Sequence, residues 1–359
     1  MIDIDDIARQ VRENCHISDA RHAGTYSICT LALRLRDLYK WEHRLLPWQE
    51  AEAAEILEWI DAREQRWETL LDQEYRPIRV ADRWHDPFDT AGINARLAPT
   101  GMFYGAGYAH GLKPTFLLAR IERHERVRGH PVWRLEREWV RDLLTLPAYR
   151  QDDAIVLRQE SGRMYLWDRM AYLGKSGRPA LNFALRKLGM NPTASESRHY
   201  DFDRLFAVVS RTFLDHEIGE IRDRVFPRPI WQRILAAYPH TPVELAARAL
   251  KDLLADTGPQ GTLRQIIKTR DAAALGLFTA FFDDLRKEFF PELRGVFSPF
   301  ADREDWRIIR SAVDTGFHNT RRKVERMMEI FENGCRSEDL PGAEKKIEQE
   351  LLESFLKRN

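Results

Sequence analysis

The sequence changes its pattern at about residue 178, and this change constrains the fold more than any other feature. From there onward, apolar residues recur at the spacing of amphipathic helices, and prolines and glycines separate the segments. Helices are predicted over 178–189, 201–225, 229–238, 242–256, 262–287, 302–333 and 342–357. We therefore expect a large C-terminal helical domain.

The first 73 residues predict a helical hairpin. Ser18 and Asp19 are typical N-cap residues, and the helix expected after them extends to about Arg44. A break at Leu46-Pro47-Trp48 precedes a second helix, which is rich in glutamate and extends to about Gln73. The first helix is basic in its later positions and the second is acidic. Their opposite charges favour pairing, although each exposed ion pair contributes little.

The middle of the chain predicts a small antiparallel sheet. Prolines and glycines punctuate residues 74–135, and short runs of β-prone residues lie between them. A hairpin turn is expected at Val127-Arg128-Gly129, between two such runs. Strands are expected over 77–80, 102–108, 115–123 and 154–159, and a helix over about 135–146.

Together these patterns predict an α+β fold that is predominantly α-helical. The expected parts are a helical hairpin at 1–73, a mixed region with a small antiparallel sheet at 74–177, and a helical domain at 178–359. The length of 359 residues agrees with this division, since a domain has roughly 100–200 residues.

Composition excludes some functions and favours one compartment. The 56 basic and 56 acidic residues cancel, so general binding to nucleic acid is not expected. No stretch approaches the roughly 18 uncharged apolar residues that a membrane-spanning helix needs. The three cysteines are far apart, and the acidic start of the chain is unlike a secretory signal. We therefore expect a cytoplasmic protein. The sequence does not decide between a protein partner and a homo-oligomer.

The segment 201–224 carries an apolar stripe that continues into polar residues. His216 and Glu220 are four residues apart and lie on the same helical face as this stripe. Asp314 and His318 have the same spacing in the helix expected over 302–333. Imidazole and carboxylate groups bind zinc, iron and manganese, so the two helices together predict a divalent metal site. The alternative is that each pair stabilises an exposed helix face by roughly 0.2–0.5 kcal/mol.

A glycine-rich segment at 101–114 is the second candidate site. The side chains there that suit a small ligand or an anion are Tyr104, Tyr108, His110 and Lys113. Glycine-rich segments form ligand-facing loops, but they also occur where strands approach each other closely. A dinucleotide-binding loop is excluded, because Pro114 and the β-prone run after it prevent the helix that such a loop requires.

Two stretches near the N-terminus resemble an uncharacterised bacterial protein family. They are Cys15-His-Ile-Ser-Asp-Ala-Arg-His-Ala-Gly24 and Leu33-Arg-Leu-Arg-Asp-Leu-Tyr-Lys-Trp-Glu42. The resemblance is best over about the first fifty residues, and it implies a bacterial, intracellular source. The family is defined by a domain of unknown function, so the resemblance implies neither an activity nor a site.

Three functions are compatible with these patterns, in the following order of preference. The first is a helical interaction or regulatory protein without catalytic activity, since familiar catalytic motifs are absent from the sequence. The second is a metal-dependent enzyme that uses His216, Glu220, Asp314 and His318. The third is a small-ligand or anion-binding protein that uses the glycine-rich segment.

Overall fold

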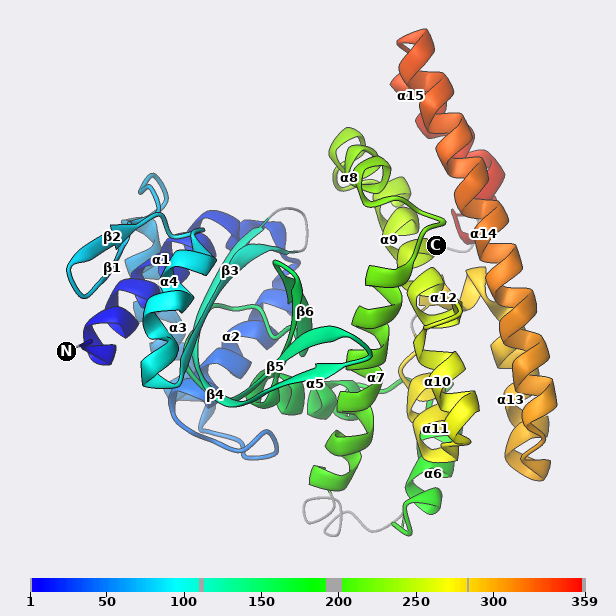
Figure 1. The fold of residues 1–359 in the computed structure, drawn as a ribbon, viewed down its shortest axis with the longest axis horizontal. Helices are drawn as coiled ribbons and strands as arrows, with labels where there is room; N and C mark the ends of the chain where they lie inside the picture. The colour runs from blue at the N-terminus through cyan, green and yellow to red at the C-terminus, as the bar shows by residue number, and fades with distance from the viewer. Residues whose placement is uncertain (1, 110–112, 192–201, 283, 357–359) are drawn as a thin grey trace. The chain divides into compact units, whose positions relative to one another are not determined.

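The computed structural model describes residues 2–109, 113–191, 202–282 and 284–356. The chain divides into two compact units, residues 1–171 (unit 1) and 172–359 (unit 2), as Figure 1 shows. Unit 1 combines helices with two sheets, and the described elements of unit 2 are all helical. The fold is therefore α+β and mainly helical, which confirms the predicted class. The division into three parts stays a prediction.

Three α-helices open unit 1. They are α1 (Ile4–His22), α2 (Ile28–Glu42) and α3 (Ala53–Glu68), with a 3-10 turn, Ala23–Thr25, after α1. Side chains join α2 to α3, since the indole N–H of Trp59 donates to Glu42 over 2.9 Å. None of the described helices is both long enough and apolar enough to cross a membrane.

The prediction that a helix begins at Ser18 and Asp19 is wrong. Asp3 caps α1, and both residues lie inside that helix with their side chains buried. The hydroxyl of Ser18 donates to the carbonyl of Pro114, and the Asp19 carboxylate accepts the backbone N–H of Leu143. Serine and aspartate side chains accept the free N–H groups at the N-terminus of a helix in many proteins. Here distant parts of the chain supply the hydrogen-bond partners of Ser18 and Asp19 instead.

Unit 1 contains two sheets. A short antiparallel pair, β1 (Ile78–Val80) and β2 (Arg83–His85), precedes helix α4 (Thr90–Leu97) and the 3-10 turn Ala98–Thr100. The larger sheet has the strand order β3-β4-β5-β7-β6, in which β5 and β7 are parallel and the other neighbours antiparallel. Its strands are β3 (Met102–Ala109), β4 (Lys113–Val127), β5 (His130–Arg141), β6 (Ala148–Gln151) and β7 (Ala154–Arg158).

The helix predicted over about 135–146 is wrong, because β5 continues to Arg141. This strand pairs with β4 on one side and with β7 on the other. Buried Glu138 of β5 forms an ion pair with buried Arg158 of β7 over 2.8 Å. Pairing with β4 decides the conformation of residues 135–141, and no local sequence pattern reveals such a neighbour.

Helix α1 packs against the larger sheet, and this contact determines where its other side chains point. Ile7, Val11 and Cys15 join a core cluster with sheet residues that include Phe116 and Val140. Arg12 and His16 lie four residues apart on an adjacent face of the helix. That face is turned toward α3, because α1 and α3 are in contact. Helix α5 (Gln159–Ala171) closes unit 1.

Helix α9 forms the centre of unit 2. Most of its residues are buried, and α7 and α14 both pack against it. The described helices are α6 (Arg178–Lys187), α7 (Phe202–Arg222), α8 (Arg228–Ala237), α9 (Pro242–Thr257), α10 (Thr262–Thr269), α11 (Ala272–Ala280), α12 (Asp284–Phe289), α13 (Pro291–Arg303), α14 (Trp306–Ser337), α15 (Leu340–Ile347) and α16 (Glu353–Leu356), with a π-helical turn at Glu348–Leu352.

The helix predicted over 262–287 is divided into α10, α11 and α12. Arg270 ends α10 in the left-handed conformation, with φ of 52°, and Asp271 caps α11 by accepting the N–H of Ala274 over 2.9 Å. The predicted helix 302–333 begins later, at Trp306, and extends to Ser337. Apolar periodicity continues across such breaks, so it marks a helical region without locating its ends.

Candidate functional site

The residues predicted to bind a ligand in the glycine-rich segment have different surroundings. Tyr104 is fully buried and donates its hydroxyl to the carbonyl of Pro87 over 2.7 Å. Tyr108 is 63% exposed, whereas Lys113 is buried. His110 lies outside the described residues. Tyr104 and Lys113 therefore belong to the interior of unit 1, and a ligand role for the segment stays a prediction.

Gly105 shows what the glycines of this segment do within β3. A Cβ atom at this position would lie 2.3 Å from the hydroxyl oxygen of Tyr149 and 2.9 Å from Leu117. No side chain fits at such distances, so the neighbouring side chains require glycine here. This observation favours the alternative explanation for the segment, namely close packing within the sheet.

Lys113 belongs to a buried ion triad that joins three parts of unit 1. Its Nζ donates to Asp19 over 2.9 Å and to Asp142 over 3.3 Å, and all three side chains are at most 3% exposed. The carboxylates also accept backbone N–H groups, Asp19 from Leu143 and Asp142 from Leu144. Burial opposes the charge of Lys113, but the carboxylates outweigh it and raise the pKa of the lysine. The triad therefore fastens α1 to β4 and to the segment after β5.

The residues predicted to bind a metal take part in separate interactions. The ring of His216 in α7 donates from Nδ1 to Asp256 over 2.9 Å, and Glu220 follows one turn later. Asp314 of α14 pairs with an arginine of α10, and His318 is exposed. Within the part of the chain that the structure describes, no three His, Cys, Asp or Glu side chains form a group that could hold a metal ion. The divalent metal therefore stays a prediction.

The His216–Asp256 pair is the centre of a polar cluster in unit 2. Buried Asp256 also accepts hydrogen bonds from the Thr262 hydroxyl over 2.9 Å and from Arg286 over 3.3 Å. Nε2 of His216 lies 3.9 Å from a carboxylate oxygen of Asp252. Burial alone would lower the pKa of His216, but the carboxylates, Asp256 foremost, raise it to about 10. The histidine is therefore protonated at neutral pH, and the pair is an ion pair.

Replacing His216 by glutamine is expected to destabilise unit 2 in a pH-dependent way. The pKa of His216 is raised on folding from 6.5 to about 10. The stabilisation is therefore complete below pH 6.5 and is lost as the pH rises through 10. Urea unfolding at about pH 6 and about pH 10 measures the free energy of unfolding of wild type and of His216→Gln. The difference in this free energy between the two proteins should be larger at the lower pH. The exposed His318, changed to glutamine, is the control, and an equal difference for His216→Gln at both pH values would contradict the ion pair.

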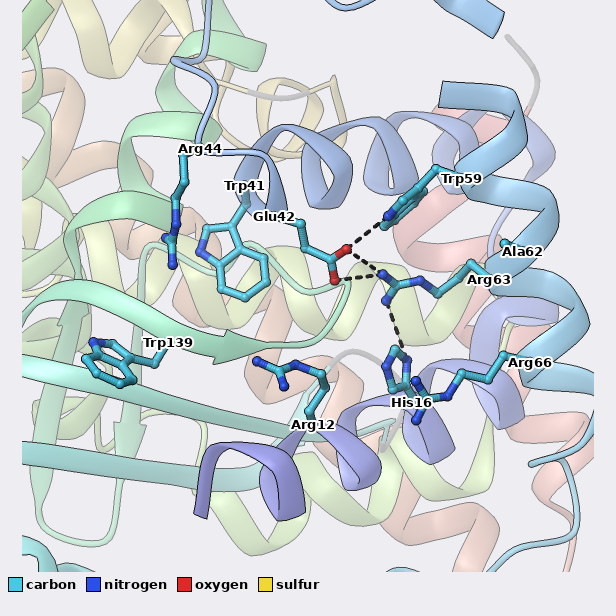
Figure 2. Close-up of a pocket in the computed structure, with 10 residues that line it drawn as sticks. All are labelled: Arg12, His16, Trp41, Glu42, Arg44, Trp59, Ala62, Arg63, Arg66 and Trp139. Carbon is cyan, nitrogen blue, oxygen red and sulfur yellow. Dashed lines mark hydrogen bonds and ion pairs between the residues drawn. The ribbon is translucent and has the colours of Figure 1, made fainter. Parts of the chain in front are cut away.

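A pocket of about 510 Å³ opens among α1, α2, α3 and β5 of unit 1 (Figure 2). Four arginines and three tryptophans make up most of its lining, and all lining residues belong to unit 1. The lining residues are Arg12, His16, Trp41, Glu42, Arg44, Trp59, Ala62, Arg63, Arg66 and Trp139. We identify this pocket as the candidate functional site.

Helical spacing brings the lining residues of α1, and most of those of α3, to one face of their helix. Arg12 and His16 are four residues apart on α1, and Trp59, Arg63 and Arg66 follow at intervals of four and three on α3. The tryptophan of β5, Trp139, packs in part against the core cluster shared by α1 and the sheet, and so lies on the side of the sheet where the pocket opens. The packing of α1 against the sheet and its contact with α3 therefore bring these polar and aromatic side chains together at the pocket.

Arg63 is the centre of the polar network in the pocket, and Figure 2 shows it between Glu42 and His16. Its Nη2 donates to the two carboxylate oxygens of Glu42 over 2.6 and 2.7 Å, and Trp59 donates to the same carboxylate. Nη1 of Arg63 lies 3.4 Å from Nδ1 of His16. Because arginine only donates, Nδ1 of His16 accepts, and we assign the ring proton to Nε2.

The imidazole of His16 is neutral because it is buried and because its surroundings are positive. Burial lowers the pKa of His16, and Arg63, Arg66 and Arg12 lower it further, to about 3. The residue is 4% exposed and lines the pocket. His16 therefore offers one N–H group to a ligand at physiological pH without adding a positive charge.

Three of the four arginines already have carboxylate partners. The ion pairs are Arg63–Glu42, Arg66–Glu13 and Arg44–Glu160. Arg12 is exposed, and it has no hydrogen bond or ion pair to the described residues. Its guanidinium group is therefore available to an anion that enters the pocket.

Two spacings in the sequence belong to this pocket and were not predicted as a site. They are the spacing of Arg12 and His16 on one helix and that of Trp59, Arg63 and Arg66 on another. Taken alone, each pattern is typical of a solvated helix face. Only the packing of α1 against both the sheet and α3 brings the two patterns together.

Comparison with known proteins places the chain in a family without assigning a function. No curated protein matches the chain, and no solved structure matches it. The resemblance noted near the N-terminus is confirmed as membership of a family of unknown function, whereas the bacterial source stays a prediction. The chain belongs to the family of unknown function DUF6866, whose N-terminal domain matches residues 6–158 and whose C-terminal domain matches residues 163–351.

Proposed function

We propose that unit 1 is a ligand-binding module that holds a small organic anion in the arginine and tryptophan pocket. One observation carries the proposal: a single pocket of about 510 Å³ brings together four guanidinium groups, three indole rings and a neutral imidazole. This volume falls within the roughly 300–1,000 Å³ of pockets that hold small molecules.

The chemistry of the lining supports an anion with an apolar part. Guanidinium groups bind carboxylate and phosphate oxygens through paired N–H donors. Indole rings add apolar area and bind flat groups by stacking. Glu42 is the only acidic residue among the described residues that line the pocket. Arg63 and Trp59 donate to its oxygens, so it repels an incoming anion less than a free carboxylate would.

This proposal differs from the functions that the sequence favoured. It keeps the idea of an anion-binding protein but transfers the site from the glycine-rich segment to the pocket. A role in interactions with other proteins stays a prediction. We also propose a reducing compartment such as the cytoplasm, which is supported by three free cysteines: Cys15 is buried, Cys29 exposed and Cys335 half-buried.

Replacing Arg12 by glutamine is expected to weaken anion binding at least tenfold. A hydrogen bond to a charged group contributes about 1.5–3 kcal/mol, and Arg12 has the guanidinium group in the pocket that is not engaged by a carboxylate within the described residues. Thermal shift and isothermal titration with a panel of small carboxylates, phosphates and sulfates would measure the affinities. The panel includes the neutral amide of each carboxylate as a reference.

Arg9→Gln is the matched control for this experiment. Arg9 lies on the same helix, 71% exposed, where it pairs with Asp6 and does not line the pocket. We expect this variant to bind as the wild type does. The proposal fails if no anion of the panel binds, or if Arg12→Gln and Arg9→Gln have the same affinity.

A further inference from the structure

We propose that the ligand of the pocket is a planar aromatic compound that carries a single carboxylate. This inference rests on the proposed function and narrows it to one chemical class. It follows from the number of unpaired charges in the pocket, from the hydrogen-bond donors beside them, and from which of the three indole rings already have a cation against them.

The count of unpaired charges favours a monoanion. Arg63 is held by Glu42, with side chains that are 10% and 27% exposed, and Arg66 by Glu13. A ligand with two or more negative charges would need to separate such pairs, which would leave their carboxylates unpaired beside it. Arg12 remains as one unpaired guanidinium group among the described residues, and it matches one negative charge.

The donors near this charge suit the two oxygens of a carboxylate. The fork of Arg12 offers parallel N–H groups, which bind a carboxylate in a bidentate way. In the view of Figure 2, Arg12 lies between Trp139 and His16. The N–H at Nε2 of His16 adds one further donor, and this ring is neutral because its pKa is about 3. The pocket thus adds hydrogen bonds without adding the second positive charge that a phosphate dianion requires.

The indole rings favour a flat group next to the carboxylate. The ring of Trp41 is covered by the guanidinium groups of Arg44 and Arg141, at 5.6 and 5.3 Å from its centroid. The ring of Trp59 has Arg63 at 4.2 Å. Trp139 is half-buried, and within the described residues no other ring or cation lies against it. Trp139 packs in part against the core cluster that α1 shares with the sheet, and the part of its ring that lines the pocket can stack with a planar ring of the ligand.

A matched series of three naphthalene compounds tests the inference on the full chain. The probes are 2-naphthoate, its neutral amide 2-naphthamide, and the dianion 2-naphthyl phosphate, each titrated by calorimetry at about pH 8, where the phosphate is doubly charged. We expect 2-naphthoate to bind at least tenfold more tightly than the amide and no more weakly than the phosphate. Octanoate, a flexible carboxylate, is expected to bind at least fivefold more weakly than 2-naphthoate.

Two variants separate the contributions of charge and ring. Arg12→Gln should abolish the difference in affinity between 2-naphthoate and its amide. Trp139→Leu should weaken the binding of both compounds by a similar factor of at least five. Trp139→Phe, which keeps a ring, should restore most of the affinity, and circular dichroism verifies that each variant is folded.

The outcomes distinguish this inference from the proposed function. If 2-naphthyl phosphate binds more tightly than 2-naphthoate, or if octanoate binds with an affinity within fivefold of that of 2-naphthoate, the ligand class is wrong although anion binding stands. The same holds if Trp139→Leu binds as the wild type does. If neither these probes nor any other organic anion binds, the proposed function itself is wrong.

Discussion

Replacing Lys113 by methionine is expected to lower the free energy of unfolding of unit 1 by about 3–5 kcal/mol, since it leaves two buried carboxylates without their cation. Asp19 and Asp142 are each about 1% exposed on their side chains, so water does not replace the lysine. Methionine has a similar length and no charge, and the change therefore removes the ion triad without removing much volume. Urea unfolding followed by tryptophan fluorescence measures the effect, because eight of the ten tryptophans precede residue 172.

Two further variants make this result specific to the buried triad. Arg9→Met removes an exposed cation from the same unit, and we expect it to change stability by less than about 0.5 kcal/mol. Adding Asp19→Asn to Lys113→Met removes one of the two orphaned charges and should recover part of the loss. A loss for Lys113→Met no larger than that for Arg9→Met would show that the triad is not essential to unit 1.

Replacing Gly219 by alanine is expected to lower the free energy of unfolding of unit 2 by about 1–3 kcal/mol, the usual effect of overpacking a core. A Cβ atom at Gly219 of α7 would lie 2.1 Å from the carbonyl oxygen of Ala255 in α9. That oxygen belongs to the backbone of a buried helix, so it does not rotate away as a side chain would. The two helices must therefore separate to admit a single methyl group.

Gly295→Ala provides the matched control for this prediction. Gly295 lies inside α13, it is exposed, and a Cβ atom there would meet nothing within 4 Å. This substitution should stabilise unit 2 by up to about 1 kcal/mol, because alanine is the better helix former. Both substitutions carry the same change in helix propensity, so thermal unfolding that shifted in the same direction for both would contradict the close contact at Gly219.

Local patterns predicted the elements whose signals lie within one segment. The helices over residues 229–238 and 242–256 correspond closely to α8 and α9, and the strand over 102–108 corresponds to β3. In each of these segments apolar spacing, proline positions and β-prone residues agree. Such agreement also placed the chain in the α+β class with a mainly helical C-terminal part.

Elements that depend on distant partners were not predicted correctly. The second half of β5, residues 135–141, looked helical because its pairing with β4 is invisible in its own sequence. Asp19 looked like a helix cap, although Lys113 and Leu143, both far away in the sequence, determine its role. His216 was predicted as a metal ligand, but its hydrogen-bond partner Asp256 lies on another helix and could not be identified from spacing.

The sequence by itself determined the class of fold, the helical nature of the second unit and the types of side chain that are available for chemistry. Only the tertiary structure decided which of those side chains meet. The arginines and tryptophans of the pocket come from three helices, the turn after α2 and one strand, and the packing of α1 against the sheet and α3 brings them together. The physical reason is that spacing along a chain fixes the face of an element, whereas the packing of the core fixes what that face meets.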